Sequence, residues 1–349
     1  MNVLMVGVDE ERAGGMWSVA ETYIKSEKFN QHVGLTYIAT STGGSALKRI
    51  KKMLIGLIQI IGVLLFQKVD VVHIHMAEKG SVFRKGLVVA LAKLFGKKIA
   101  IQMHAGPIVH WYSTLDGTTQ SLVRFILNSS DKLLVLGEYW KRELCSIIDE
   151  RKIQVLYNGT ICSNSNNYNV DGKNIVFLGM ITERKGAFDL IKAVSLVDRE
   201  ISADIKVLMC GLDFDGKAEK YSRELHLEQR IVFVGWVDSL YKEKIFRNAM
   251  LCVLPTYFEG LSMTVIEAMA HGVPVITTNI STMPELLGRD YSLIIPGDID
   301  GLCEQLRHMC NDKNARLKTS AYLFNRAKAM YSLEKNINST LSIYKELID

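Results

Sequence analysis

Two glutamates flank a predicted helix start in the segment 255–276, which reads PTYFEGLSMTVIEAMAHGVPVI. The segment predicts a strand end, a loop with Glu259, and a helix that begins near Leu261 and has Glu267 on its second turn. A helix start presents backbone N–H groups without intrahelical partners, and these suit a pyrophosphate. Such amides would come from Gly260, Leu261 and Ser262. Eight helical residues span about 12 Å, so one acid could accept from a ribose and the other from a sugar of one nucleotide sugar.

The surroundings of these glutamates resemble the family-four retaining glycosyltransferases of GT-B architecture, whose marker is a glutamate, seven residues and a second glutamate. The spacing alone is a weak signal, but the flanking residues match as well, and the resemblance covers essentially the whole chain. The matching blocks are Phe258-Glu259-Gly260-Leu261, Glu267-Ala268-Met269-Ala270 and Gly272-Val273-Pro274-Val275-Ile276. The resemblance implies that Glu259 contacts the transferred sugar and that Glu267 binds the ribose.

The same resemblance assigns phosphate binding to Lys185, because the family has a lysine here that neutralises the donor diphosphate. A lysine suits this role since its ammonium is a compact charge. The chain departs from the family at Met180, where an arginine usually follows the glycine and pairs with this lysine. Arg184 is the candidate substitute, although its side chain could equally point to solvent.

Further positions fit the family pattern in the first half of the chain. Gly14 and Gly15 follow the first predicted strand, where the family brings backbone N–H groups close to donor phosphate and acceptor; a Gly-Gly pair alone is weak evidence. His104 ends the fourth predicted strand. Its place at a carboxyl end favours the family's cleft-lining histidine over a satisfied structural one. Asn158 stands where the family has an Asn-Gly turn, and an ordinary turn explains it equally well.

No metal site is predicted. Asp213 and Asp215 match the D-x-D metal motif of the other major glycosyltransferase fold, but they stand in a loop after a strand, and a turn is the better interpretation. His73 and His75 alternate on one strand and so face one side, yet no third ligand accompanies them. The six cysteines include no C-x-x-C pair, which argues against a zinc site or a disulfide framework.

Short apolar runs of strand length alternate with helix-patterned segments, six in each half. They are NVLMVGV, HVGLTYIA, VDVVHIHM, KIAIQMH, DKLLVLG and IQVLYNG, then NIVFLGM, IKVLMCG, IVFVGW, MLCVLPT, PVITTN and SLIIPG. This rhythm indicates parallel sheets covered on both faces. The predicted fold class is α/β: GT-B, with two Rossmann-like doubly wound domains facing an interdomain cleft. Its parts are an N-terminal domain at 1–162, a polar linker at 163–173, a nucleotide-sugar-binding domain at 174–330, and a C-terminal helix at 331–349 that packs back toward the N-terminal domain.

The first half is basic, since residues 1–165 hold 20 Lys and Arg against 13 Asp and Glu, whereas the remainder holds 22 against 24. This imbalance favours an anionic surface or acceptor, and the lack of interleaved aromatic residues argues against nucleic acid. Segment 47–66 is a basic turn followed by an apolar run, too short to cross a membrane. A buried crossover helix is the simpler interpretation, and an interfacial helix on anionic lipid is the alternative. Its basic contacts would be Lys48, Arg49, Lys51 and Lys52.

These features predict a retaining, metal-independent glycosyltransferase without a cofactor. It would move a hexose-type sugar from a nucleotide diphosphate sugar to a glycan or polyprenyl-pyrophosphate-linked acceptor of a bacterial surface polysaccharide. The expected catalytic residues are Glu259, His104 and Lys185, and the expected donor-binding residues are Gly15, Asn158, Arg184, Lys185, Gly260, Leu261, Ser262 and Glu267. The start MNVLMVGV lacks a secretory signal and indicates the cytoplasm, with peripheral attachment at the inner face of the cell membrane as an option. A nucleotide-sugar epimerase and a non-catalytic partner subunit stay open as alternatives, the latter favoured by Met180.

Overall fold

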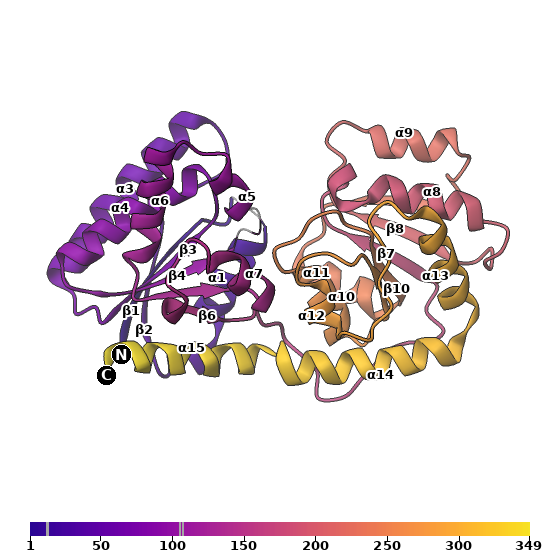
Figure 1. The fold of residues 1–349 in the computed structure, drawn as a ribbon. Coiled ribbons are helices and arrows are strands. Elements are labelled where there is room, and N and C mark those ends of the chain that lie inside the picture. Colours follow the sequence, from indigo (N-terminus) through magenta and orange to yellow (C-terminus); the bar gives the residue numbers. More distant parts are fainter. Residues whose placement is uncertain (12–13, 105, 107) are drawn as a thin grey trace. The chain divides into compact units, whose positions relative to one another are not determined.

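The computed structural model describes residues 1–11, 14–104, 106 and 108–349. It divides into two compact units, the first made of Met1–Gly159 and Glu334–Asp349 and the second of Thr160–Leu333 (Figure 1). The sequence placed the first boundary at residue 162 and the return of the chain at 331, so both crossings differ from the prediction by three residues. Within the described residues, no helix is both long and apolar enough to cross a bilayer.

A six-stranded parallel sheet with the order β2-β1-β3-β4-β5-β6 forms the centre of the first unit. Its strands are β1 (Asn2–Gly7), β2 (Gly34–Ala39), β3 (Val71–Met76), β4 (Lys98–Met103), β5 (Lys132–Val135) and β6 (Ile153–Val155). All six lie in the apolar runs that predicted them. The strand order reverses between β1 and β3, and the carboxyl edge at such a reversal is where sheets of this kind bind ligands.

Helices cover both faces of this first sheet. Along one face, α3 (Ala46–Phe66), α4 (Gly80–Leu94) and α6 (Gly117–Asn128) lie side by side (Figure 1). The other helical segments of the unit are α1 (Gly15–Lys25), α2 (Glu27–Asn30), α5 (Ile108–Ser113), α7 (Glu138–Leu144), η1 (Glu150–Lys152) and α15 (Leu333–Ile348). Helix α15 packs beside α1, where the hydroxyls of Tyr23 and Thr340 lie 3.0 Å apart in the core.

The second unit contains a five-stranded parallel sheet with the order β11-β10-β7-β8-β9. The strands are β7 (Asn174–Leu178), β8 (Lys206–Cys210), β9 (Ile231–Gly235), β10 (Ala249–Leu254) and β11 (Val275–Thr277). The helical segments are η2 (Glu183–Lys185), α8 (Ala187–Val197), α9 (Lys217–Glu224), α10 (Ser239–Arg247), α11 (Met263–Ala270), α12 (Met283–Leu287), α13 (Ile299–Asn311) and α14 (Lys313–Met330). Here the order reverses between β7 and β10.

The sixth strand predicted for the second unit does not form. The segment 292–297, SLIIPG, makes only an isolated bridge between Ile294 and Thr278. Ile295 is 69% exposed, and the chain turns at once, because the Asp298 amide bonds to the Ile295 carbonyl at 3.0 Å. An apolar run of strand length is therefore not sufficient where a turn follows after one paired residue.

The polar segment 163–173 was predicted to be a linker, but it is fixed to the second unit. Asn166 Nδ2 donates to Ser320 Oγ at 2.9 Å, and the Tyr168 hydroxyl donates to the Met250 carbonyl at 2.8 Å. Its Asn and Tyr side chains thus act as anchors, which a composition-based linker prediction does not take into account.

Candidate active site

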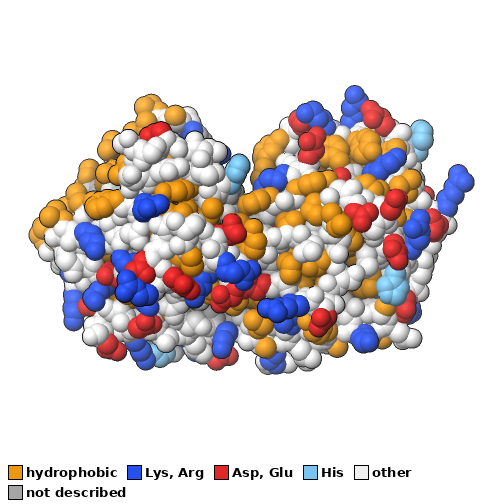
Figure 2. Space-filling view, viewed as in Figure 1, with side chains coloured by type: hydrophobic (Ala, Val, Ile, Leu, Met, Phe, Trp, Pro, Cys, Tyr) orange, Lys and Arg blue, Asp and Glu red, His pale blue; other side chains and the backbone are white. Residues whose placement is uncertain are grey.

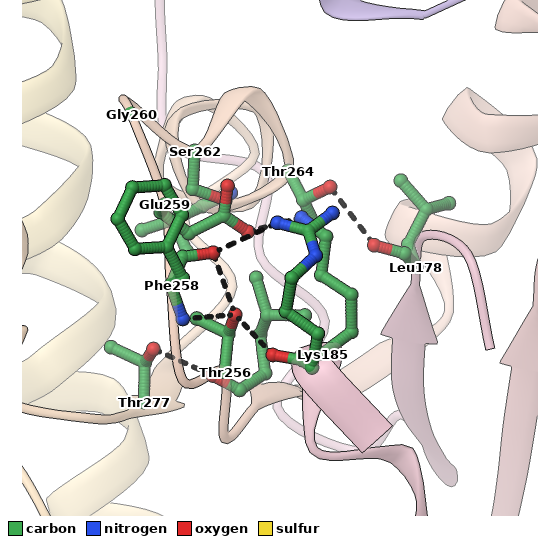
Figure 3. A network of polar contacts seen from close by, with 12 residues as sticks. Leu178, Lys185, Thr256, Phe258, Glu259, Gly260, Ser262, Thr264 and Thr277 are labelled. Atoms are coloured by element: carbon green, nitrogen blue, oxygen red, sulfur yellow. Dashed lines mark hydrogen bonds and ion pairs between the residues drawn. The ribbon is translucent and has the colours of Figure 1, made fainter. Parts of the chain in front are cut away.

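Two charged side chains meet where the second sheet reverses its strand order. Lys185 follows β7 in η2, and Glu259 follows β10 in the loop that leads to α11. The Lys185 ammonium forms an ion pair with the Glu259 carboxylate, and the two side chains are only 17% and 10% exposed (Figure 3). The carboxyl edge at a reversal point is the usual ligand position in open parallel sheets. The fold therefore brings together the two residues that the sequence singled out in this unit.

Hydroxyl groups hold the backbone around Glu259 in place. Ser281 Oγ and Thr282 Oγ1 donate to the carbonyl oxygens of Glu259 and Gly260 at 2.7 and 3.0 Å. The hydroxyl of Thr256, which is fully buried, lies 3.1 Å from a carbonyl oxygen of η2 (Figure 3). Because the loop is fixed from both sides, it needs little reordering to meet a ligand, which reduces the cost of binding.

Helix α11 begins at Met263, two residues later than predicted. Ser262 is its N-cap, and the Ser262 hydroxyl oxygen accepts a bond at 3.4 Å from the amide of the third helical residue. The Thr264 hydroxyl donates at 3.0 Å to the last carbonyl of β7 (Figure 3). Gly260 and Leu261 lie in the loop just before this helix. The three predicted anion-binding positions thus stand at the entry to α11, where the positive end of the helix dipole favours negative charge.

Glu267 is paired with a lysine that the sequence analysis missed. Lys242 Nζ on α10 lies 2.7 and 2.8 Å from the two carboxylate oxygens of Glu267 on α11. The two side chains are 23% and 14% exposed, so the pair is largely shielded from solvent. This contact orients the carboxylate while each oxygen keeps a further lone pair for other donors. No local sequence signal indicates Lys242, because only the fold brings it to Glu267.

Arg184 lies against the same loop. Its Nη1 donates to the Phe258 carbonyl oxygen at 3.3 Å, and the side chain is exposed. Met180, which stands where the resembling family has an arginine, follows β7 and is 44% exposed. The structure therefore places Arg184 as a second cation beside the Glu259 loop, rather than extended into solvent.

Three histidines form a row in the first sheet that runs from the middle of β3 to the carboxyl end of β4. The rings of His73 and His75 stack with centroids 4.8 Å apart, as the strand alternation predicted for side chains on one face. His75 Nδ1 lies 2.8 Å from His104 Nε2, and His73 Nδ1 forms a hydrogen bond with the Tyr344 hydroxyl of α15. His104 is therefore oriented by a second histidine, which the sequence analysis considered only as a metal ligand without enough partners.

All three histidines are held in the neutral state. Burial lowers the pKa of His73 to about 4, an effect that a hydrogen bond to the Gln102 side chain partly opposes. Burial, with smaller contributions from its neighbours His73 and His104, also holds the pKa of His75 well below the usual range. Removal from water, with a further contribution from His73, lowers the pKa of His104 to about 3. A neutral His104 can donate or accept a hydrogen bond at physiological pH.

These low histidine pKa values predict that acid destabilises the protein. The unfolded chain binds the protons near pH 6.5, whereas the folded chain excludes them until about pH 4 for His73. The unfolding free energy should therefore fall as the pH drops from 7 to 5, with a slope that approaches about 1.4 kcal/mol per pH unit below pH 6.5 for each histidine that stays neutral. Urea unfolding at pH 7, 6 and 5 measures this slope. His73→Gln removes one of these histidines, so it should reduce the slope by the contribution of one proton, about 1.4 kcal/mol per pH unit. An unchanged slope would contradict the prediction.

Two further predicted donor-binding residues, Gly15 and Asn158, lie in the first unit. Gly14 is the N-cap and Gly15 the first residue of α1, and both are exposed. Space is open at both positions, because a Cβ added to either would meet no atom within 4 Å among the described residues. Asn158 is buried, and its Oδ1 accepts a bond from Gln102 Nε2 at 3.3 Å. Its side chain is therefore engaged with a residue of β4.

The D-x-D segment has local partners in the structure. Asp213 Oδ2 accepts from the Glu219 amide at 3.0 Å, and Asp215 pairs with Lys217 at 2.7 Å. Both aspartates thus close the turn before α9, as the sequence analysis interpreted them. Among the described residues, no group of three or more His, Cys, Asp or Glu is placed to hold a metal ion.

Two of the four basic residues predicted to contact lipid or acceptor have acidic partners. Lys48 pairs with Glu11 at 2.5 Å and Lys52 pairs with Asp9 at 3.2 Å. Arg49 and Lys51 on the same helix are exposed. The predicted cluster is therefore divided between residues held by the loop after β1 and residues open to solvent.

Two doubly wound parallel units of this kind are typical of the GT-B architecture, and the predicted α/β fold class with two such units is confirmed. The Anabaena protein HepE, solved in complex with UDP, has the same fold, with a TM-score of 0.76 at 12% identity over 99% of this chain and 100% of that chain.

Residues 172–312 match the family model of the glycosyl transferases group 1. An uncharacterized glycosyltransferase of Methanocaldococcus jannaschii is 24% identical over 242 residues, which cover 62% of this chain and 60% of that protein. The lipopolysaccharide 1,6-galactosyltransferase of Salmonella typhimurium is 34% identical over 104 residues, which cover 28% of this chain and 29% of that protein. Both matches thus span less than two thirds of the relative's length. The match to the glycosyl transferases group 1 thus lies in the second unit, and the predicted resemblance to glycosyltransferases is confirmed.

Proposed function

We propose that the protein transfers a hexose-type sugar, with retention of configuration, from a nucleotide diphosphate sugar to a glycan or polyprenyl-pyrophosphate-linked acceptor. The observation that supports this best is the shielded pair of Lys185 and Glu259 at the reversal point of the second sheet, directly before α11. A cation, a carboxylate and a helix start at one sheet edge suit the diphosphate and the sugar hydroxyls of such a donor.

Donor binding would exchange the partners of this ion pair. The diphosphate competes for Lys185, and Glu259 is then released to accept hydrogen bonds from sugar hydroxyls. As the bond to the anomeric carbon breaks, negative charge grows on the leaving diphosphate. Lys185, Arg184 and the amides at the start of α11 would stabilise that charge without a metal ion.

Retention would follow from attack by the acceptor on the face from which the diphosphate departs. Once released from Lys185, Glu259 would serve as a hydrogen-bond acceptor for sugar hydroxyls rather than as a nucleophile. Isolation of a covalent glycosyl adduct on Glu259 would refute this route. The lipopolysaccharide galactosyltransferase relative supports a surface-polysaccharide acceptor, and the neighbour solved with UDP supports a nucleotide donor.

A thermal-shift screen against nucleoside diphosphates and their sugars tests the donor proposal. A ligand at 100 times its Kd stabilises the folded state by about 2.7 kcal/mol, which is readily measured. Lys185→Gln should abolish the shift. Transfer to an added acceptor then separates a transferase from an epimerase, which would release a changed nucleotide sugar without one. A protein that no nucleotide stabilises would favour the non-catalytic subunit instead.

Lys242 is expected to set donor affinity through Glu267. Lys242→Met leaves the shielded carboxylate without its charge partner, so we expect the donor KM to rise about tenfold while kcat changes less than threefold. Lys242→Arg, which keeps the charge and can pair with both oxygens, should restore most of the affinity. Steady-state kinetics with varied donor measure the effect, and an equal fall of kcat and kcat/KM in the Met variant would argue against this positioning role.

A further inference from the structure

The outer surface formed by α3, α4 and α6, here called the three-helix face, is unusually apolar. Twelve large apolar side chains exposed in the described part of the chain lie on these helices, eight of them on α3. They include Leu47, Leu54, Ile58 and Leu65 on α3, Leu94 on α4 and Phe125 on α6. Hydrophobic side chains gather along the margin of the first unit over α3 and α4 (Figure 2). Soluble monomers rarely leave so much contiguous apolar surface without a partner.

Helix α3 exposes more large apolar side chains than the other two helices of this face. Only Gly56, Ile60 and Leu64 are buried, and they define the side that faces the sheet. The opposite side should be polar in a surface helix. Instead it presents Leu54 at 55% and Ile58 at 70% exposure. This outcome corrects the simpler prediction of a buried crossover helix, because the helix is a crossover but most of its apolar residues are exposed.

The charge on the three-helix face has one sign. None of α3, α4 and α6 contains an Asp or Glu residue. Exposed basic side chains are present at Arg49, Lys51 and Lys93. An apolar surface with basic residues suits a layer that is anionic outside and apolar just beneath. A second copy of the same face is a poor partner, because apposing two such surfaces would bring basic residues together with no acid on these helices to pair with them.

We propose that the three-helix face docks on the surface of an anionic lipid bilayer. The apolar side chains of α3 would enter the headgroup boundary, and Arg49 and Lys51 would contact the lipid phosphates. The basic start of α3 follows β2, so it lies at the carboxyl edge of the first sheet, the same edge as His104. Docking would therefore hold that edge close to the membrane, where a lipid-linked acceptor is found. The docking itself depends only on the exposed surface and does not require the proposed transfer reaction.

Vesicle sedimentation with the full chain tests the proposal. We expect binding to phosphatidylcholine vesicles containing 30% phosphatidylglycerol at about 50 mM salt, little binding to pure phosphatidylcholine, and release at about 500 mM salt, where charges are screened. The double variant Leu54→Gln, Ile58→Gln should weaken binding at least about tenfold. Arg49→Gln with Lys51→Gln should weaken it about 25-fold, or fivefold for each charge. The matched control is Leu317→Gln, an exposed leucine of α14 in the second unit, and it should bind like the wild type.

The same samples distinguish the competing occupants. Circular dichroism and melting curves confirm that the variants fold, which is expected since the replaced side chains are exposed. Absence of binding to the anionic vesicles at low salt would overturn the proposal. It would also be overturned if the double variants of the three-helix face bound these vesicles as tightly as the wild type. A dimer in light scattering that Leu54→Gln, Ile58→Gln converts to a monomer, without vesicle binding, would assign the face to a second copy. Nucleotide thermal shifts of the same variants should stay unchanged, so a failure of docking is separable from a failure of the donor proposal.

Discussion

Lys185→Gln is expected to lower kcat/KM for sugar transfer by a factor of about 1,000. The variant removes the cation that would stabilise the leaving diphosphate, and such a charge contributes most in a shielded site. It also leaves the Glu259 carboxylate, which is 10% exposed, without its ion-pair partner. Both effects oppose donor binding and bond cleavage, so kcat should fall and KM should rise. Initial rates with a labelled nucleotide sugar measure the change.

Two controls separate the charge of Lys185 from its role in folding. Lys185→Arg retains a cation, so we expect it to recover at least tenfold of the lost activity. Lys192→Gln on α8 removes a lysine that has no role in the proposed site and should leave the rate within twofold of the wild type. If Lys185→Gln folds and still transfers sugar within fivefold of the wild type, then Lys185 does not stabilise the leaving group.

The strands and their order around the site follow from patterns visible in the sequence. Buried parallel strands are apolar along their length, and the helices between them have a different period, so eleven strands were located correctly. A strand order that reverses next to β7 and β10 places the loops after these strands at one edge. The motif residues Lys185 and Glu259 stand in those loops, which is why the sequence could predict their proximity.

Features that depend on contacts between distant segments were not predictable in this way. Lys242 looks like any surface lysine of an amphipathic helix until the fold places it against Glu267. The exposure of α3 was equally hidden, because a helix that is apolar on nearly all sides gives no periodicity to show which side faces the sheet. The stacked histidines combine residues of two strands, and only the register of β3 with β4 brings His104 to His75.

Glu259→Gln is expected to lower kcat about 100-fold or more while it changes nucleoside diphosphate affinity less than fivefold. The amide is nearly the same size as the carboxylate, and its oxygen can still accept from Lys185, so the loop held by Ser281 should keep its structure. What the variant loses is the negative charge that would accept bonds from the sugar hydroxyls and balance positive charge developing at the anomeric carbon. The effect should therefore appear in kcat.

Calorimetric titration with the nucleoside diphosphate, together with steady-state rates, separates these two quantities for Glu259→Gln. The matched control is Glu243→Gln on α10, an exposed glutamate that pairs with Arg247 at 2.6 Å, and we expect it to leave both quantities within twofold of the wild type. If Glu259→Gln loses nucleotide affinity as much as kcat, the carboxylate acts by holding Lys185 and the loop. If the variant retains the full rate, Glu259 contributes to folding alone, and the sugar must be recognised by other residues at this edge of the sheet.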